Sequence, residues 1–365
     1  MKINFLIPFI SKSGGIIAVL EYFQHLKNKG HDPVLYYPLI PHWSIVSEKA
    51  SVLLKIAIVA KRFLLKRRIN WYFEPIPVTP VFNFSNRFIR DADISVATAW
   101  PTAYDNYRLN PSKGIKFYFV QGHETWINDT KTVENSYRLP LKIITISPWL
   151  TKIMEEKYSR KVEIEIHNGI RTDKFRPSLI RKEETITIST QYHELECKGS
   201  KEALLALDRI KKEFPQTRII IFGLFAAPER TFDFEYYRNP SMAQIISIYQ
   251  QSHIYLFTSR AEGWGMTPLE AMACKCAVAA TSVGSISVIG NDKNIMRIEI
   301  NNVESVVEGL RELICNRTKR EYIAENGYQT SLNMSWEKQS DRLEKVFLEA
   351  VREPNAAKDI FNNYK

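Results

Sequence analysis

The chain has no long apolar run and only four cysteines. Both features limit the classes of protein to which it can belong. Among its 365 residues, no segment reaches the ~18–20 consecutive apolar residues that a membrane-spanning helix requires. The four cysteines form neither a zinc-ligand pattern nor a disulfide framework. Residues 1–10 are too short and too weakly charged for a signal peptide, and they predict a first β-strand instead. We therefore expect a cytoplasmic protein in a reducing compartment.

Cofactor and metal motifs are also missing. A dinucleotide-dependent oxidoreductase would carry Gly-x-Gly-x-x-Gly after its first strand and an acidic residue about twenty positions later, but Ser13-Gly14-Gly15 stands there. No cluster of His, Cys, Asp and Glu predicts a metal site. Asp91-Ala92-Asp93 has the spacing of a metal-binding pair, but it immediately precedes a predicted strand, where capping and solvation account for it. We expect no metal and no cofactor.

The net positive charge of the chain lies mainly in its first half. The net charge is +10, and residues 1–168 contain 23 Lys and Arg against 14 Asp and Glu. Residues 51–70 carry six basic residues, no acidic residue, and enough apolar side chains to cover one face of a helix. Such a helix can lie on an anionic membrane surface, which would make the protein peripheral on the inner face of the cell membrane. A core helix with a solvated basic end is the alternative. No aromatic-basic stacking pattern accompanies the charge, so nucleic acid is not an expected partner.

Strand-like and helix-like segments alternate in both halves, which predicts an α/β protein of two doubly wound Rossmann-like domains facing each other across a cleft. We expect an N-terminal domain over residues 1–170 and a C-terminal domain over 171–335. Residues 70–86 contain three prolines and are predicted to be irregular. The predicted strands are residues 3–8, 33–37, 93–97, 115–120, 142–146, 162–166, 185–189, 218–222, 254–257 and 277–280. The predicted helices are residues 16–26, 201–213, 241–251, 268–274, 304–314, 319–332 and 336–351.

Two carboxylates, Glu262 and Glu270, flank a glycine-containing loop between a predicted strand and a helix. Gly263 and Gly265 let the backbone approach a ligand closely, and a helix N-terminus favours a phosphate. Acidic groups on both sides suit a ligand that also carries hydroxyls, such as a nucleotide sugar. The alternative for Glu270 is the third position of a capping box that begins at Thr267.

The segment from Glu262 to Ala273 resembles the donor-site signature of retaining glycosyltransferases of family 4, which have the two-domain GT-B architecture. Three further stretches resemble the same family in the expected order, and together the four span nearly the whole chain. They are Ser13-Gly14-Gly15, Asn168-Gly169-Ile170 through Pro177, and Lys198-Gly199. The resemblance implies that the final helix, within residues 336–365, packs back on the N-terminal domain.

The resemblance also implies roles for individual residues. Lys198 would bind the donor's phosphates, Glu270 the ribose hydroxyls, and Glu262 the hydroxyls of the transferred sugar. The family pairs its lysine with an arginine five positions earlier, where this chain has His193, which is only partly charged near neutral pH. The expected donor-binding residues are Gly14, Gly15, His193, Lys198, Gly263, Trp264, Gly265, Met266, Thr267 and Glu270.

His123 follows a predicted strand of the N-terminal domain, and in the family a histidine in this region reaches the donor sugar near the reacting centre. We therefore expect His123 and Glu262 to be catalytic, with an ordinary loop histidine as the alternative. Glu124, Trp100 and Trp126 are candidates for contact with the acceptor.

The sequence thus favours a retaining, metal-independent glycosyltransferase whose partners are a nucleotide-sugar donor and a cell-surface glycan or lipid-linked acceptor. A nucleotide-sugar epimerase or a glycan phosphorylase of the same architecture is a second interpretation, although an epimerase would need a different acid–base set. A non-catalytic membrane-surface adaptor is a third, and it would explain residues 51–70 but not the segment from Glu262 to Glu270.

Overall fold

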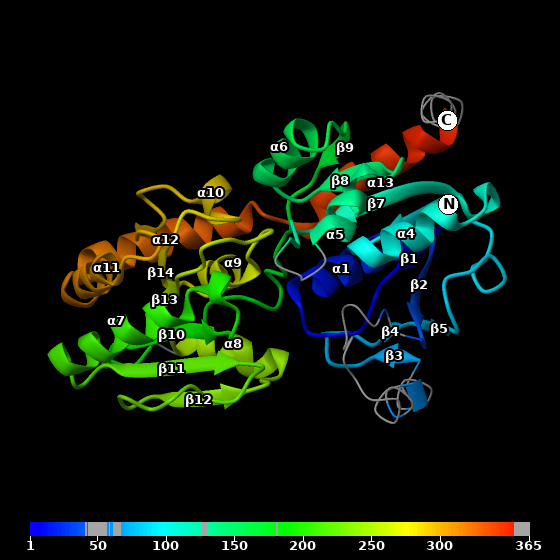
Figure 1. Ribbon diagram of the computed structural model, residues 1–365. Helices are drawn as coiled ribbons and strands as arrows, with labels where there is room; N and C mark the ends of the chain where they lie inside the picture. The colour runs from blue at the N-terminus through cyan, green and yellow to red at the C-terminus, as the bar shows by residue number, and fades with distance from the viewer. Residues whose placement is uncertain are drawn as a thin grey trace. The chain divides into compact units, whose positions relative to one another are not determined.

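The chain divides into two compact units. The computed structural model describes residues 1–40, 42, 57, 59–60, 67–125, 130–179 and 182–353 (Figure 1). Unit 1 consists of Met1–His167 together with Trp336–Lys365, and unit 2 is Asn168–Ser335. The chain therefore crosses between the two units after His167 and again after Ser335.

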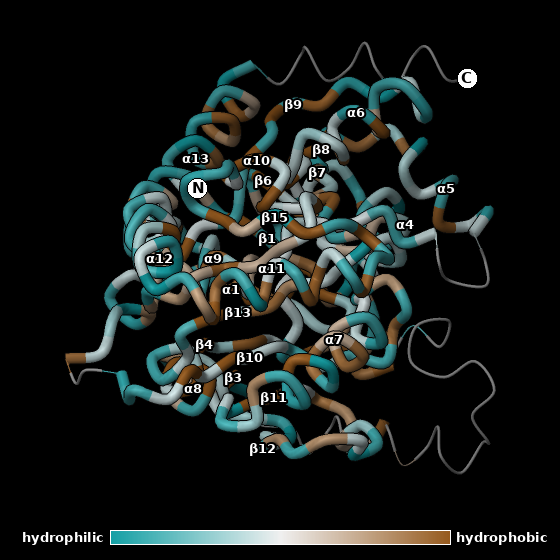
Figure 2. Tube along the Cα trace, turned by 90° about the vertical axis from the view of Figure 1, so that its left-hand side faces the viewer, coloured by the Kyte–Doolittle hydropathy of each residue, from teal (hydrophilic) through white to brown (hydrophobic). Residues whose placement is uncertain are grey.

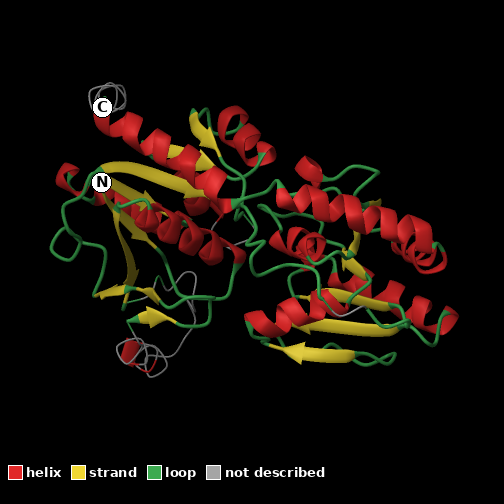
Figure 3. Cartoon of the chain, turned by 180° about the vertical axis from the view of Figure 1, so that it is seen from behind, coloured by secondary structure: helices red, strands yellow, loops and turns green. Residues whose placement is uncertain are grey.

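Unit 1 is built on a seven-stranded sheet in the order β5-β2-β1-β6-β7-β8-β9, in which every neighbouring pair is parallel. Residues 117–120 of β7 are all buried, as expected for a parallel strand covered by helices on both faces (Figure 3). The strands are β1 (Lys2–Leu6), β2 (Asp32–Pro38), β5 (Thr79–Val81), β6 (Ile94–Ala97), β7 (Ile115–Val120), β8 (Lys142–Thr145) and β9 (Val162–Glu165).

The helices of unit 1 connect these strands and cover the sheet. Helix α1 (Gly14–Asn28) buries every residue from Ile16 to Phe23, which requires neighbours on more than one side of the helix. The other helices are α4 (Trp100–Arg108), α5 (Thr130–Arg138), α6 (Pro148–Glu156), α13 (Trp336–Arg352) and the short 3-10 turn Pro111–Lys113.

Unit 2 has a six-stranded parallel sheet in the order β12-β11-β10-β13-β14-β15. Its core joins alternate residues of β10, β11 and β13 to the apolar faces of α7 and α11. The strands are β10 (Thr187–Tyr192), β11 (Arg218–Gly223), β12 (Glu235–Arg238), β13 (Ile254–Phe257), β14 (Ala277–Ala280) and β15 (Met296–Arg297). The helices are α7 (Ser200–Glu213), α8 (Met242–Gln251), α9 (Met266–Ala273), α10 (Ile286–Ile289), α11 (Val303–Cys315) and α12 (Arg317–Leu332).

Helix α13 belongs to unit 1 although it follows unit 2 in the sequence. Hydrophilic and hydrophobic residues alternate within its turns (Figure 2). The Trp336 ring packs edge-on against Tyr22 of α1, and the Phe347 ring lies 4.9 Å from that of Phe117 in β7. On the rim of the contact, Glu344 forms ion pairs with Lys29 at 2.6 Å and with His31 at 2.7 Å.

The segment from 70 to 86 is more ordered than predicted. It contributes β4 (Ile76–Pro77), which pairs with β3 (Arg68–Ile69), and β5, which extends the main sheet beside β2. The rest of the segment consists of bends and turns, so the prediction of an irregular segment holds outside these two short strands. Pro80 fits in β5 because this is an edge strand, where its missing N–H leaves no ladder bond unmade. Most of residues 51–70, including the predicted basic helix, lies outside the described residues.

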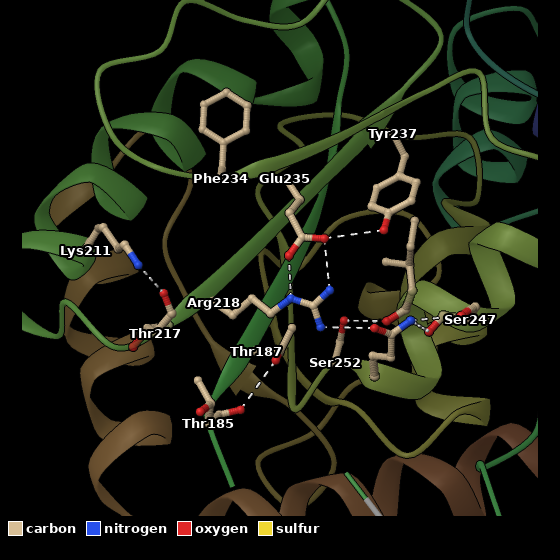
Figure 4. A network of polar contacts seen from close by, with 12 residues as sticks. Thr185, Thr187, Lys211, Thr217, Arg218, Phe234, Glu235, Tyr237, Ser247 and Ser252 are labelled. Carbon is tan, nitrogen blue, oxygen red and sulfur yellow. Dashed lines mark hydrogen bonds and ion pairs between the residues drawn. The ribbon is translucent and has the colours of Figure 1, made fainter. Parts of the chain in front are cut away.

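A polar network ties the edge strand β12 to its neighbour (Figure 4). The guanidinium of Arg218, at the start of β11, forms a two-pronged ion pair with Glu235 of β12, at 2.5 and 2.9 Å, and also donates to Gln251. The Arg218 side chain lowers the pKa of the Glu235 carboxyl. The network lies at the amino ends of the strands and therefore stabilises the sheet edge opposite the loops described below.

The prediction of two doubly wound parallel α/β domains is confirmed. All ten predicted strands and all seven predicted helices overlap elements of the structure. The strands that were missed are short ones, such as β5, β12 and β15. Within the described ranges, no helix is long and apolar enough to cross a membrane.

Replacing Phe347 by alanine tests the contribution of α13. The side chain is fully buried, so its removal should lower the free energy of unfolding by about 3–5 kcal/mol. Urea denaturation of the full chain measures this change. Lys345→Ala, on the exposed face of the same helix, is the matched control and should stay within about 0.5 kcal/mol of wild type. A Phe347→Ala protein as stable as the control would contradict the packing described for α13.

Candidate active site

In unit 2 the sheet grows in two directions from β10. The chain adds β11 and β12 on one side of β10, then β13, β14 and β15 on the other. The loops after β10 and β13 therefore diverge at the carboxyl ends of two adjacent strands, which is where open α/β sheets bind ligands. Lys198 ends the 3-10 turn Glu196–Lys198 after β10, and Glu262 lies in the loop after β13. The topology thus brings these two predicted residues together.

Lys198 and Glu262 form a closed ion pair. The Lys198 ammonium donates to both carboxylate oxygens of Glu262, at 2.7 and 2.8 Å. Ser259 Oγ donates to Glu262 Oε1 at 2.8 Å. The Glu262 side chain is 11% exposed and that of Lys198 is 29% exposed, so the pair is partly withdrawn from water. Opposite charges at this depth attract more strongly than on an open surface.

The turn that carries Lys198 is packed directly against the end of β13. Gly199 has φ +64°, and a Cβ at this position would collide with the carbonyl oxygen of Thr258. In return Thr258 Oγ1 donates to Gly199 O at 2.8 Å, and the Arg260 N–H donates to Cys197 O at 2.7 Å. The glycine after Lys198 is therefore required by a close approach of two backbones.

Arg260 is a structural residue of this site that the sequence did not single out. Its guanidinium pairs with Glu196 at 2.6 Å and with Glu202 of α7 at 2.6 Å. These contacts raise the pKa of Arg260 and fasten the Lys198 turn from both sides. The signal available in the sequence was an arginine two residues before Glu262, with acidic residues on both sides of Lys198.

The loop from 263 to 265 leads into α9 through a glycine with positive φ. Gly265 has φ +76° and is the N-cap, without a side-chain cap. The backbone of the loop is held by Ser285, whose N–H donates to Trp264 O and whose Oγ donates to Gly265 O at 2.8 Å. Met266 and Thr267 are therefore the first two residues of the helix, where backbone N–H groups lack intrahelical acceptors.

This geometry corrects the predicted capping box. Thr267 is the second helical residue rather than the N-cap, and Glu270 lies in the second turn. The glycine with positive φ starts the helix two residues earlier than Thr267 would. Glu270 therefore does not cap α9.

Glu270 and Trp264 are both buried. Tyr249 OH donates to Glu270 Oε2 at 3.1 Å, and burial raises the pKa of Glu270 to about 7. Trp264 is 2% exposed. At neutral pH, Glu270 is therefore shared between its charged and neutral forms.

His193 is not a substitute for the expected arginine as a permanent cation. The Leu195 N–H donates to His193 Nδ1 at 3.0 Å, so this nitrogen is unprotonated and Nε2 carries the hydrogen. Burial lowers the pKa of His193, and the nearby Lys198 lowers it further. Its ring stands edge-on to Phe225 with centroids 4.7 Å apart. His193 is a neutral donor in this site.

Unit 1 has the same type of switch point, between β1 and β6. Gly14 and Gly15 begin α1 after β1, without a side-chain cap from Ser13. The side chain of Gln121, after β7, lies against Gly15 and donates to Thr98 O, after β6, at 3.3 Å. Gln121 therefore joins the loops that follow three neighbouring strands, a role that the sequence did not reveal.

His123 and Glu124 follow β7 at this edge of the sheet. His123 Nε2 is 2.8 Å from Tyr158 OH, and burial lowers the pKa of His123. Burial raises the pKa of Glu124 to about 7. Tyr137 OH accepts from the Glu124 N–H and donates to Gly122 O, which fixes the backbone that carries both residues.

Trp100 and Trp126 were expected near an acceptor, and the structure describes only Trp100. Trp100 is the first residue of α4 and is 4% exposed, in a turn capped by Thr102 Oγ1, which accepts from the N–H groups of Thr98 and Ala99. Trp126 lies outside the described residues. Across the part of the chain that is described, no group of three or more His, Cys, Asp and Glu could hold a metal ion.

Comparison with known proteins finds similarity to glycosyltransferases. Residues 170–330 match the family model of Glycosyl transferases group 1. That segment lies within unit 2 and contains both Lys198 and Glu262.

Two curated relatives carry glycosyltransferase names. The chain is 36% identical over 110 residues to the uncharacterized glycosyltransferase MJ1178 of Methanocaldococcus jannaschii, covering 30% of this chain and 31% of that protein. It is 24% identical over 246 residues to the capsular polysaccharide biosynthesis glycosyltransferase CapM of Staphylococcus aureus, covering 60% of this chain and 62% of CapM. The matches thus span less than two thirds of either relative.

Solved structures share the fold over nearly the whole chain. Sucrose-phosphate synthase from Thermosynechococcus elongatus has a TM-score of 0.71 at 12% identity, covering 95% of this chain and 98% of its own. A glycosyltransferase from Rickettsia africae has a TM-score of 0.70 at 17% identity, with the same coverage. Anabaena HepE in complex with UDP and glucose has a TM-score of 0.69 at 13% identity, covering 96% and 100%. The two parallel-sheet domains are those of the GT-B fold.

The raised pKa of Glu270 predicts a pH-dependent stability. Because the folded protein binds this proton more tightly than the unfolded chain, stability should fall as pH rises from about 4.5 through about 7. The Glu270→Gln protein lacks this titration. Relative to wild type it should gain about 2–3 kcal/mol in unfolding free energy between pH 5 and pH 8. Urea denaturation at both pH values measures the difference, and a constant difference would show that Glu270 titrates normally.

Proposed function

We propose that the chain is a retaining, metal-independent glycosyltransferase that moves a sugar from a nucleoside-diphosphate donor to a glycan or lipid-linked acceptor. The observation that carries the proposal is the Lys198–Glu262 pair at the switch point of unit 2, inside the segment that matches the group 1 family model. Lys198 can bind a phosphate and Glu262 can bind hydroxyls, and the two charged groups lie 2.7 Å apart.

Residues of unit 2 can stabilise the negative charge of the departing diphosphate. Lys198 offers a fixed positive charge, and the first N–H groups of α9, at Met266 and Thr267, offer oriented donors. In the transfer, the bond from the sugar's anomeric carbon to the phosphate oxygen breaks. The acceptor oxygen bonds to the same carbon on the same face, and the departing phosphate takes the acceptor's proton. The chain's residues hold and stabilise these groups.

Glu262 and Glu270 have different parts in this proposal. Glu262 accepts hydrogen bonds from hydroxyls of the transferred sugar. Glu270 is assigned to the ribose hydroxyls, and its raised pKa lets the buried carboxyl remain partly neutral until donors arrive.

Residues of unit 1 complete the proposal. His123 is assigned to the donor sugar near the reacting centre. Burial lowers its pKa, which favours the neutral ring, so it can exchange hydrogen bonds with sugar hydroxyls without adding charge. Glu124 is assigned to contact with the acceptor, and burial raises its pKa to about 7. The name of CapM, from capsular polysaccharide biosynthesis, supports a surface glycan as the acceptor class.

The basic segment of residues 51–70 also supports a proposal for where the protein is located in the cell. Unit 1 carries most of the chain's net positive charge, and a basic amphipathic helix would hold it on the anionic inner face of the cell membrane. A lipid-linked acceptor would be presented at the same surface.

Nucleotide binding tests the proposal. UDP, GDP, dTDP and ADP are titrated calorimetrically against the full chain without metal and with EDTA. UDP is the first choice, because HepE was crystallised with it. We expect one nucleoside diphosphate to bind and Lys198→Met to weaken it about 10- to 100-fold, the range for a lost charge-assisted hydrogen bond.

Lys201→Gln is the matched control, since Lys201 lies three residues further on and is exposed. It should leave the affinity within about twofold of wild type. Failure of all four nucleotides to bind would contradict the proposal, as would full affinity in Lys198→Met.

A further inference from the structure

The charge that would bind phosphate is already neutralised inside unit 2. Lys198 donates to both oxygens of Glu262, and the carboxylate is 11% exposed. Any phosphate that takes Lys198 must therefore compete with a carboxylate of this chain. It must also leave that carboxylate poorly hydrated and close to a second negative charge.

We propose that Glu262 determines specificity for the sugar-loaded nucleotide over the free nucleoside diphosphate, by acting as the internal counter-ion of Lys198. This inference rests on the proposed function and adds a consequence for product release. The carboxylate opposes the product more strongly than it opposes the donor.

The donor can compensate Glu262 for the loss of Lys198. Sugar hydroxyls donate hydrogen bonds to the carboxylate while the phosphates take the ammonium, so both members of the pair exchange one partner for another. Ser259 keeps its hydrogen bond to Oε1 throughout, which holds the carboxylate in place. A buried ion that retains partners on exchange avoids the full cost of desolvation.

The free nucleoside diphosphate cannot do this. Loss of the sugar removes the hydroxyl donors and leaves a terminal phosphate that gains about one further negative charge at neutral pH. Glu262 then faces this phosphate without a compensating donor. Return of the carboxylate to Lys198 restores the closed pair and favours release.

Neighbouring basic groups do not relieve the competition. Arg260 is engaged by Glu196 and Glu202, both at 2.6 Å. His193 is neutral, since Nδ1 accepts from the Leu195 N–H and burial lowers its pKa. The competition for Lys198 is therefore set by Glu262.

The test compares the affinity of the four nucleoside diphosphates, UDP, GDP, dTDP and ADP, for wild type and Glu262→Gln. Removing the carboxylate charge should strengthen binding of the free nucleoside diphosphate about tenfold, which corresponds to one unit charge about 5 Å away at intermediate dielectric constant. The same substitution should lower sugar transfer. A merely structural role for Glu262 would weaken both.

Two variants distinguish the effect of the Glu262 charge from the effects of side-chain shape and of position in the chain. Glu262→Asp keeps the charge and should bind the nucleoside diphosphate within about threefold of wild type. Glu194→Gln makes the same chemical change four residues from Lys198, at an exposed carboxylate outside the site, and should leave the affinity unchanged. Urea denaturation checks that each variant is folded.

The outcomes are distinct. If wild type binds a nucleoside diphosphate and folded Glu262→Gln binds it equally or more weakly, the inference fails and the proposed function stands. If neither protein binds any of the four, both fail. If Glu262→Gln does not fold, the inference is tested by the affinities of the wild-type protein alone. It should bind the matching nucleotide sugar at least as tightly as the free diphosphate, and a clear preference for the free diphosphate would overturn the inference.

Discussion

The balance of one positive and one negative charge at the carboxyl ends of β10 and β13 is the constraint on which the site depends. Lys198 and Glu262 are partly withdrawn from water, so neither can stand alone without a large loss of solvation. The surroundings hold the pair closed: Gly199 permits the close approach of the two loops, Arg260 fastens the lysine turn, and Ser259 fixes the carboxylate. In the proposed function, the entering donor replaces both halves of the pair, because it is anionic at one end and rich in hydroxyls next to it.

Sequence reasoning succeeded where topology alone decides position. Buried apolar runs such as residues 254–257 and 277–280 predict parallel strands, and β13 and β14 lie there. The resemblance marked Lys198 and Glu262 separately, and their ion pair at the switch point became visible only in the structure. It failed where local backbone geometry decides. The positive φ of Gly265 starts α9 before Thr267 and removes the predicted capping box. Pro80 looked like a strand breaker, but an edge strand tolerates it. Arg260 and Gln121 had no motif to mark them, because their roles arise from contacts between distant loops.

Burial shifts the pKa values of several side chains that were predicted to bind ligands. His193, in the position of an expected arginine, is held neutral by a backbone donor and by burial, so positive charge at this crevice is concentrated on Lys198. Burial raises the pKa of Glu270 in unit 2 and of Glu124 in unit 1 to about 7. Carboxyls that are partly neutral at physiological pH cost less to bury than full charges and still become strong acceptors when donors arrive.

The most direct test of this account is a crystal structure of the full chain with the nucleotide sugar that it binds. The account predicts that the Lys198–Glu262 pair is open, with the ammonium within about 3 Å of a phosphate oxygen and the carboxylate within about 3 Å of sugar hydroxyls. A closed pair, with the nucleotide sugar bound elsewhere on the chain, would contradict it.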